Sequence, residues 1–156
     1  MRNRLVLVTL CLVLALPAAA EEKPYRVSLT GDGFDGTSWQ TGVLIELAPG
    51  WKTYWRMPGD SGVPPEFAWS TSLPAKVEVL YPTPSRHVDK SGEAVGYDSA
   101  VLFPVTVTPE QAQGLELKLD LFFGVCKDIC IPARAEAAIM LGTEQRDPLG
   151  SARVEA

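Results

Sequence analysis

Alternation of apolar and polar side chains is the feature of this sequence that most limits its fold. The clearest stretch runs from residue 115 to residue 121, where leucine occupies every odd position and a charged residue every even one. Successive side chains of a β-strand point to opposite faces of a sheet, so this period predicts a strand with one buried and one exposed face. Shorter or weaker runs of the same period predict strands at residues 27–29, 43–47, 77–79, 101–107 and 133–141.

Turn-forming residues lie between these stretches. Clusters of glycine, proline, aspartate and serine occur at residues 31–33, 49–50, 58–62, 64–65 and 82–84. No window of about a dozen residues repeats its apolar positions with the period of an amphipathic helix. About seven or eight short strands with turns of this kind predict an all-β protein, and the expected architecture is an immunoglobulin-like β-sandwich.

The first twenty residues predict a secretory signal peptide that is removed from the mature protein. Arg2 and Arg4 precede an apolar run at residues 5–16, which is followed by a proline and three alanines. The run is shorter than the roughly twenty residues that a membrane-spanning helix needs. We therefore expect export to the periplasm, no stable membrane insertion, and loss of Cys11 with the signal peptide.

Residues 21–142 are expected to form one domain, followed at residues 143–156 by a tail or by the start of a further element. Across the whole chain 14 lysines and arginines stand against 19 aspartates and glutamates, a net charge of −5. A protein without a basic surface is a poor ligand for phosphate backbones, so nucleic acid is not an expected partner. One histidine and no nucleophile motif leave no arrangement for a hydrolytic active site.

Two cysteines, Cys126 and Cys130, remain after removal of the signal peptide. They fall between two expected strands, in a loop or a distorted hairpin at one end of a sheet. Exported proteins meet an oxidising compartment, so a disulfide is the first expectation. Closing a loop of five residues stabilises a fold by only roughly 2 kcal/mol, and short-loop disulfides are often strained and easily reduced. From the residues alone, a redox pair, a structural bridge and a metal site with His87 all stay open.

The aromatic residues suggest a different function. Trp51 and Trp55 fall on one side of an expected strand, where tryptophan packs into a core more often than it binds a ligand. The main alternative to a redox domain is a secreted β-sandwich that binds a glycan or a peptide through Trp51, Tyr54, Trp55 or Trp69 and has a structural disulfide. A copper or zinc chaperone is the second alternative.

Four groups of residues follow one another with a distinctive spacing. They are Gly50-Trp51-Lys52-Thr53-Tyr54-Trp55-Arg56 with Pro58-Gly59-Asp60-Ser61-Gly62, then Tyr81-Pro82, then Gly96-Tyr97 before Val101, and last Val125-Cys126-Lys127-Asp128-Ile129-Cys130-Ile131-Pro132. Together these groups resemble the N-terminal periplasmic domain of the DsbD family of thiol:disulfide interchange proteins, closer to its ScsB-like branch. The resemblance spans residues 25–142.

This resemblance implies an immunoglobulin-like domain with a reversible Cys126–Cys130 disulfide and no cofactor. The domain would act as a protein-disulfide reductase component, with a membrane-embedded electron relay as donor and exported thioredoxin-like proteins as acceptors. By the same analogy Cys130 forms the mixed disulfide with a partner and Cys126 resolves it. The membrane domain and thioredoxin-like domain of longer members do not occur in these 156 residues, so the donor is expected to be a separate protein.

The resemblance also implies a loop that covers the disulfide and moves aside for a partner. Its counterpart is expected at about residues 85–98. Some relatives have an aromatic residue at the tip of this loop, whereas no phenylalanine, tyrosine or tryptophan occurs between residues 87 and 92. Either weaker shielding or shielding by Tyr97 is therefore expected, with His87, Asp89 and Tyr97 as the cap and rim residues.

Overall fold

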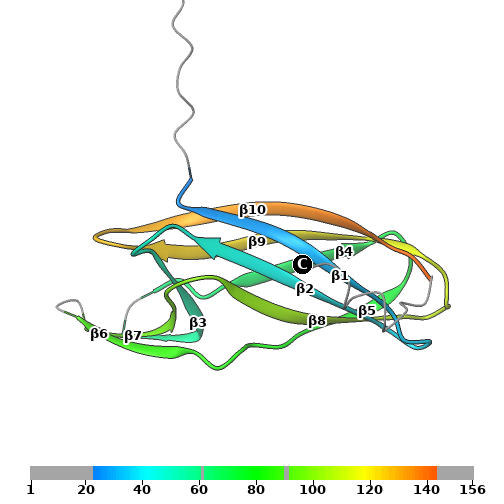
Figure 1. Ribbon diagram of the computed structural model, residues 1–156, viewed down its shortest axis with the longest axis horizontal. Coiled ribbons are helices and arrows are strands. Elements are labelled where there is room, and N and C mark those ends of the chain that lie inside the picture. The colour runs from blue at the N-terminus through cyan, green and yellow to red at the C-terminus, as the bar shows by residue number, and fades with distance from the viewer. Residues whose placement is uncertain (1–22, 61, 90–91, 144–156) are drawn as a thin grey trace, which may run out of the picture.

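The computed structural model of this protein describes residues 23–60, 62–89 and 92–143, and the regular elements in these ranges are all β-strands (Figure 1). The ten strands are β1 (Tyr25–Phe34), β2 (Trp39–Leu47), β3 (Lys52–Gly59), β4 (Glu66–Thr71), β5 (Ala75–Val79), β6 (Ser85–Asp89), β7 (Gly92–Tyr97), β8 (Val101–Pro109), β9 (Leu115–Cys126) and β10 (Cys130–Leu141). None of the described residues forms a helix long and apolar enough to cross a bilayer. The expected signal peptide with Cys11, and residues 144–156 of the expected tail, lie outside the described residues.

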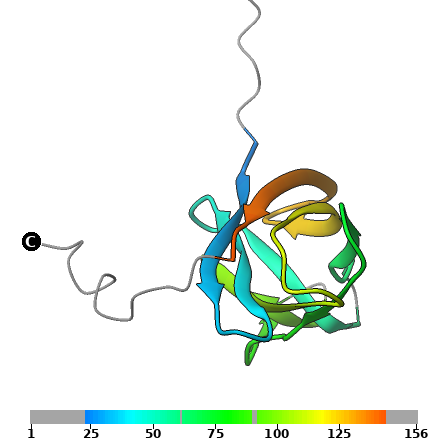
Figure 2. The ribbon, with the colours of Figure 1, turned by 90° about the vertical axis from the view of Figure 1, so that its right-hand side faces the viewer.

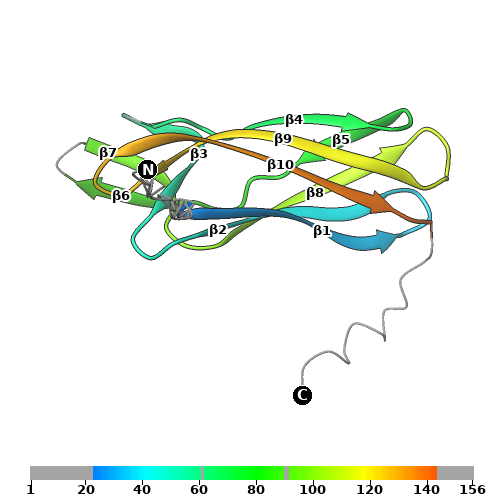
Figure 3. The ribbon, with the colours of Figure 1, turned by 90° about the horizontal axis from the view of Figure 1, so that it is seen from above.

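The strands pair into two antiparallel sheets that face each other as a sandwich. In the view from above, β9 and β10 of one sheet lie over β8 and β2 of the other (Figure 3). One sheet has the order β1-β2-β8-β5, and the other has the order β10-β9-β3-β7-β6 with β4 also paired to β9. Figure 2 looks along the strands and shows the two sheets curving around a common interior. The prediction of an all-β sandwich from the alternating pattern is therefore confirmed.

The number of strands is larger than predicted, because the described residues form ten strands rather than seven or eight. The alternation did not reveal β4, β6 and β7, which have only five or six residues each. Strand β6 is mostly polar, while β7 contains two glycines and is at least half-buried along its whole length. Neither strand therefore has the contrast between an apolar face and a polar face that the pattern detects.

The interior is filled by the side chains that the alternation placed on one face. The four leucines at odd positions 115–121 of β9 are at most 2% exposed. Phe103 on β8 is fully buried, and three aromatic rings meet it at steep angles with centroid distances of 5.3–5.5 Å: Phe67, Tyr81 and Tyr97. Trp51, Trp55 and Trp69 are half-buried and pack against this core. The sequence favoured core packing over ligand binding for Trp51 and Trp55, and core packing is confirmed.

We expect Phe103→Ala to lower the free energy of unfolding by about 3–5 kcal/mol, because it removes a fully buried ring from among three aromatic neighbours. The matched control is Leu102→Ala, since Leu102 is the adjacent residue but is 47% exposed. Its expected cost is at most about 1 kcal/mol. Guanidinium unfolding followed by circular dichroism measures both values. Equal losses in the two variants would contradict the central place of Phe103 in the core.

Candidate functional site

Strands β9 and β10 form a long hairpin whose closed end carries both cysteines. Every residue from Leu115 to Cys126 has a partner in β10, and the last pair is Cys126 with Cys130. A disulfide joins these two residues, with 4.1 Å between their Cα atoms. The sequence indicated a loop or a distorted hairpin here. The cysteines instead end β9 and begin β10, because the regular pairing continues up to a turn of three residues.

The two cysteines differ in their access to solvent. Cys126 is 5% exposed, whereas Cys130 and the three turn residues before it are exposed. Two of these turn residues, Lys127 and Asp128, carry opposite charges, so the turn has no net charge beside the disulfide. A partner can therefore approach the pair most directly from the side of Cys130.

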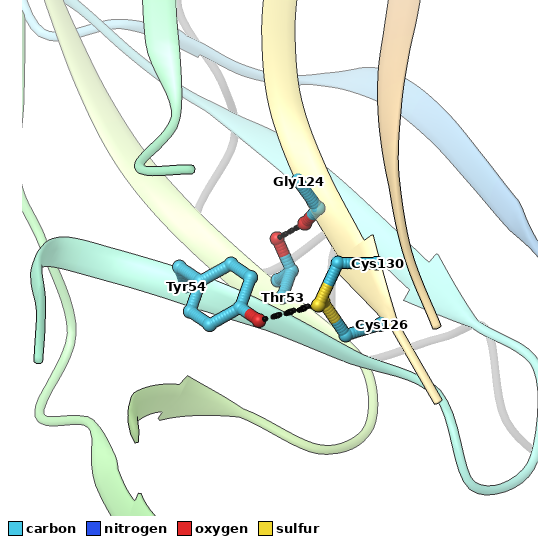
Figure 4. Close-up of a disulfide and its surroundings, with 5 residues drawn as sticks. All are labelled: Thr53, Tyr54, Gly124, Cys126 and Cys130. Atoms are coloured by element: carbon cyan, nitrogen blue, oxygen red, sulfur yellow. Dashed lines mark hydrogen bonds between the residues drawn. A yellow bond between two sulfur atoms is a disulfide. The ribbon is translucent and has the colours of Figure 1, made fainter. Parts of the chain in front are cut away.

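Tyr54 on β3 points its hydroxyl group at the disulfide (Figure 4). The hydroxyl oxygen lies 2.6 Å from Cys126 Sγ and 3.2 Å from Cys130 Sγ. Neither sulfur of a disulfide carries a hydrogen, so the tyrosine hydroxyl is the donor in these contacts. The side chain is 5% exposed and covers the buried sulfur. From the sequence, Tyr54 belongs to one residue group of the family resemblance and to the ligand-facing residues of the binding alternative. Nothing in the pattern links it to cysteines more than seventy residues later, so no role at the disulfide is predicted for it.

Pairing between β3 and β9 places Tyr54 beside the cysteines. Lys52 is the register partner of Cys126, and Thr53 is the partner of Val125. Thr53 is buried and donates its hydroxyl hydrogen to the Gly124 carbonyl at 2.8 Å, which fastens β3 to β9 just before the disulfide (Figure 4). Because side chains alternate along a strand, Tyr54 then lies on the opposite face of β3 from Thr53, toward the sulfurs.

Two glycines leave room for the Tyr54 ring. A Cβ atom on Gly62 would lie 2.5 Å from Tyr54 Cε1, and one on Gly124 would lie 3.2 Å from Tyr54 Cδ2. The first distance is shorter than any normal carbon contact, so a larger residue at position 62 would displace the ring. The ring thus packs closely between the backbones of Gly62 and Gly124, in the position from which its hydroxyl reaches the sulfurs.

The segment expected as a capping loop at about residues 85–98 is a β-hairpin formed by β6 and β7. His87 pairs with Ala94 in this hairpin and is half-buried, with its Nε2 atom enclosed and without a hydrogen-bond partner among the described residues. Val88 is 76% exposed. Asp89 is the last residue of β6. The segment pairs as strands because β7 itself pairs with β3, which extends the sheet that carries the disulfide.

Tyr97 lies in the core, away from the place expected for a capping residue. Its hydroxyl donates to the Pro82 carbonyl at 2.9 Å, and its ring packs edge-on against Phe103. Burial, assisted by the neighbouring Tyr81, raises the pKa of Tyr97 to about 12. The tyrosine that contacts the sulfurs is Tyr54. The two differ because β7 turns the side chain of Tyr97 toward the inner face of the sheet, whereas β3 turns Tyr54 outward.

The metal alternative needs the thiolates of Cys126 and Cys130, whereas the structure joins these two residues in a disulfide. In the part of the chain that the structure describes, no three or more histidine, cysteine, aspartate or glutamate side chains gather closely enough to hold an ion. His87 is instead part of the β6/β7 hairpin. The site is a disulfide in which Cys130 is exposed, whereas Cys126 is buried and its sulfur accepts a hydrogen bond from the Tyr54 hydroxyl.

Comparison with known proteins agrees with this geometry. Residues 17–141 match the family model described as "Thiol:disulfide interchange protein DsbD, N-terminal". No curated protein sequence matches the chain. A similar solved structure is the N-terminal periplasmic domain of ScsB from Proteus mirabilis, with a TM-score of 0.65 and 28% sequence identity. The match covers 89% of this chain and 53% of that one, so this chain spans about half the length of its solved relative. The shared fold confirms the immunoglobulin-like β-sandwich.

The raised pKa of Tyr97 predicts a loss of stability in alkali. The unfolded chain loses its phenolic proton near pH 10, but the folded protein holds it up to about pH 12. The stabilising contribution is therefore complete below about pH 10 and disappears as the pH rises toward 12. We expect urea midpoints to fall less steeply in this range for Tyr97→Phe than for the unsubstituted protein. Parallel pH profiles would show that Tyr97 ionises equally in both states.

Proposed function

Because this chain belongs to the family of N-terminal domains of the thiol:disulfide interchange protein DsbD, we propose that Cys126 and Cys130 are its catalytic residues and carry electrons from one protein to another. The observation that carries this proposal is the position of the disulfide, at the exposed end of a hairpin with one accessible and one buried cysteine. Thiol–disulfide exchange needs such an accessible sulfur and a stable place for the sulfur that leaves.

Loading of the pair takes two exchange steps. A thiolate of the reduced donor attacks Cys130 Sγ, a bond forms between the two proteins, and the Cys126–Cys130 bond breaks with its electron pair on Cys126. The second donor thiolate then attacks the donor sulfur of this mixed disulfide and releases Cys130. The donor leaves as a disulfide, and the two cysteines have gained two electrons and, after protonation, two hydrogens.

Delivery runs through the same two residues in the opposite sense. The Cys130 thiolate attacks a disulfide of the acceptor and forms a mixed disulfide, which Cys126 resolves as it closes the bond to Cys130 again. The acceptor leaves with two thiols. The direction of net transfer follows the difference between the reduction potentials of donor and acceptor.

The exposure of the cysteines and the contact with Tyr54 support this order of attack. Cys130 is the accessible residue, so it meets the partner, and Cys126 becomes the leaving group. The Tyr54 hydroxyl is nearer to Cys126 Sγ than to Cys130 Sγ. A donor at this distance stabilises negative charge on the leaving sulfur, because hydrogen bonds to charged groups are stronger than those to neutral ones.

A purely structural role for the disulfide has less support. The bond closes the end of a hairpin that already has twelve paired positions, and the core lies between the sheets without it. The loop of five residues is too short to restrict the unfolded chain strongly. The binding alternative is also weakened, because Trp51, Trp55 and Trp69 are half-buried and use part of their ring surface to pack against the core.

Location and partners belong to this proposal. The solved relative is a periplasmic domain, and the sequence begins with a predicted signal peptide, so we place the protein in the periplasm. Thioredoxin-like proteins there are the proposed acceptors, and a membrane-embedded relay is the proposed donor. In this scheme the protein is a thiol–disulfide oxidoreductase component that works as a protein-disulfide reductase.

Serine variants of the two cysteines test the proposed roles. Cys126→Ser keeps the attacking Cys130 but removes the resolving thiol, so we expect it to accumulate a mixed disulfide with a thioredoxin-like partner. Cys130→Ser leaves only the buried thiol and is expected to trap much less. Non-reducing electrophoresis with mass spectrometry measures the trapped species. Trapping by Cys130→Ser alone, or electron transfer by the double variant, would overturn the assignment.

The Tyr54 hydroxyl is expected to speed reduction of the disulfide. We predict that Tyr54→Phe, which keeps the ring but removes the donor, slows reduction by dithiothreitol about tenfold, the equivalent of roughly 1.4 kcal/mol. Stopped-flow tryptophan fluorescence measures the rate. Tyr25→Phe is the matched control, because the Tyr25 hydroxyl donates to the Arg134 carbonyl on β10 and contacts no sulfur. An unchanged rate in Tyr54→Phe would refute the contribution of the hydroxyl.

A further inference from the structure

The turn between β3 and β4 is attached to the start of β7. The Asp60 N–H donates to the Glu93 carbonyl at 2.9 Å, and the Glu93 N–H donates to Asp60 Oδ2 at 3.0 Å. Gly59 pairs with Ala94 next to these bonds, and its backbone runs so close to that of Glu93 that a Cβ atom on Gly59 would collide with it. Asp60 therefore fixes the turn to β7 through both its backbone and its side chain.

The same turn supports the tyrosine at the disulfide. Two residues after Asp60, Gly62 lies against the Tyr54 ring, and the next residue, Val63, accepts a hydrogen bond from the Gly124 N–H at 3.0 Å. The ring has Gly124 as its other backbone neighbour. A displacement of Gly62 therefore removes one of the backbone neighbours of the ring.

The register of β3 shows why this support is needed. Strand β3 pairs regularly with β7 at Thr53 and Tyr54, but its register then shifts before the next pair, at Gly59. Between Tyr54 and Gly59 the pairing of β3 with β7 is therefore irregular. On the far side of this shift, β3 is held by the Gly59–Ala94 pair and by the two bonds between Asp60 and Glu93.

We infer that Asp60 is a positioning residue for the Cys126–Cys130 pair, which acts by holding the turn against Tyr54 and so keeping the Tyr54 hydroxyl on the sulfurs. This inference rests on the proposed function and names a residue that determines how fast the site reacts. Asp60 itself contacts neither cysteine in this scheme.

The chemical step that Asp60 supports is the first exchange. A thiolate bonds to Cys130 Sγ while the bond from Cys130 to Cys126 breaks, and the electron pair of that bond stays on Cys126. The Tyr54 hydroxyl hydrogen faces that sulfur and stabilises its new charge. When the ring is free to turn, the hydrogen faces the sulfur for only part of the time, and the step slows.

Kinetics with dithiothreitol, a small dithiol, test the inference on the whole mature chain. We expect Asp60→Ala to slow reduction of the disulfide on the order of fivefold, which is within the range for loss of a hydrogen-bonded contact. Asp60→Asn is expected to restore the rate, because its side-chain oxygen can accept the same bond from the Glu93 N–H.

The matched control is Asp35→Ala. The Asp35 carboxylate accepts hydrogen bonds from the Thr37 and Ser38 N–H groups in the turn between β1 and β2, at the end of the sandwich opposite the disulfide (Figure 1). It holds a turn as Asp60 does, but it has no connection to Tyr54. Dithiothreitol should reduce the disulfide of Asp35→Ala at the same rate as that of the unsubstituted protein.

A double variant separates positioning from a general loss of structure. In the Tyr54→Phe background the hydroxyl is already gone, so Asp60→Ala should slow reduction no further. An equal slowing in both backgrounds, or no slowing in either, would overturn the inference. If Asp60→Ala does not fold, Asp60→Ser takes its place, because serine favours turns but is one bond shorter than aspartate.

The reduction kinetics and the trapping of a partner can fail independently of each other. Dithiothreitol replaces every protein partner, so these rates report only the reactivity of the pair. Failure of Cys126→Ser to trap a partner would overturn the proposed function whatever the rates are. A normal rate in Asp60→Ala would overturn the role of Asp60 even when a partner is trapped.

Discussion

The register between β9 and β10 is the constraint on which the rest of the structure depends. It pairs Leu115 with Leu141 at the open end of the hairpin and Cys126 with Cys130 at the closed end. Because side chains alternate along both strands, this one alignment turns the leucines of β9 into the core and brings the two sulfurs within bonding distance. A shift by one residue would move the leucines to the solvent face and separate the cysteines. Core formation therefore selects the alignment of β9 and β10 that the disulfide needs. No contact within the site is required to set this alignment.

Most of the sandwich could be predicted from the sequence, because its long strands alternate apolar and charged residues. The leucines of β9 show this best, since their alternation exists only if one face of the strand is buried. The β6/β7 hairpin could not be predicted in this way, and a loop was expected in its place. Strand β7 lies beside β3 and β6 lies beyond it at the border of the sheet, where pairing with a neighbour rather than burial of one face determines the strand. The residues that determine this hairpin therefore include those of β3, in another part of the chain.

The candidate site likewise has one part that could be predicted from the sequence and one part that could not. The cysteine pair could be found from its spacing and from its resemblance to a family, because both residues lie in one short segment. Tyr54 could not, since it reaches the sulfurs only after β3 pairs with β9. Tyr97 was the more obvious tyrosine near the expected cap, but the orientation of β7 sends its side chain into the core. The turn expected at residues 58–62 begins later in the structure, because Pro58 and Gly59 still belong to β3. The contact of Gly62 with an aromatic ring depends on where β3 and β9 lie.

The separation of the two parts of the site along the chain has a consequence for folding. The cysteines are four residues apart, so their bond can close in a chain that has not yet folded, at a small cost in loop entropy. The Tyr54 contact spans 72 residues and exists only once the sandwich has assembled, and sandwiches rich in such distant contacts fold slowly. In an oxidising compartment, a newly made chain can thus form the disulfide before Tyr54 reaches it. In a chain oxidised at that stage, the pair is accessible to thiols until the sandwich assembles, and folding then covers a bond that already exists.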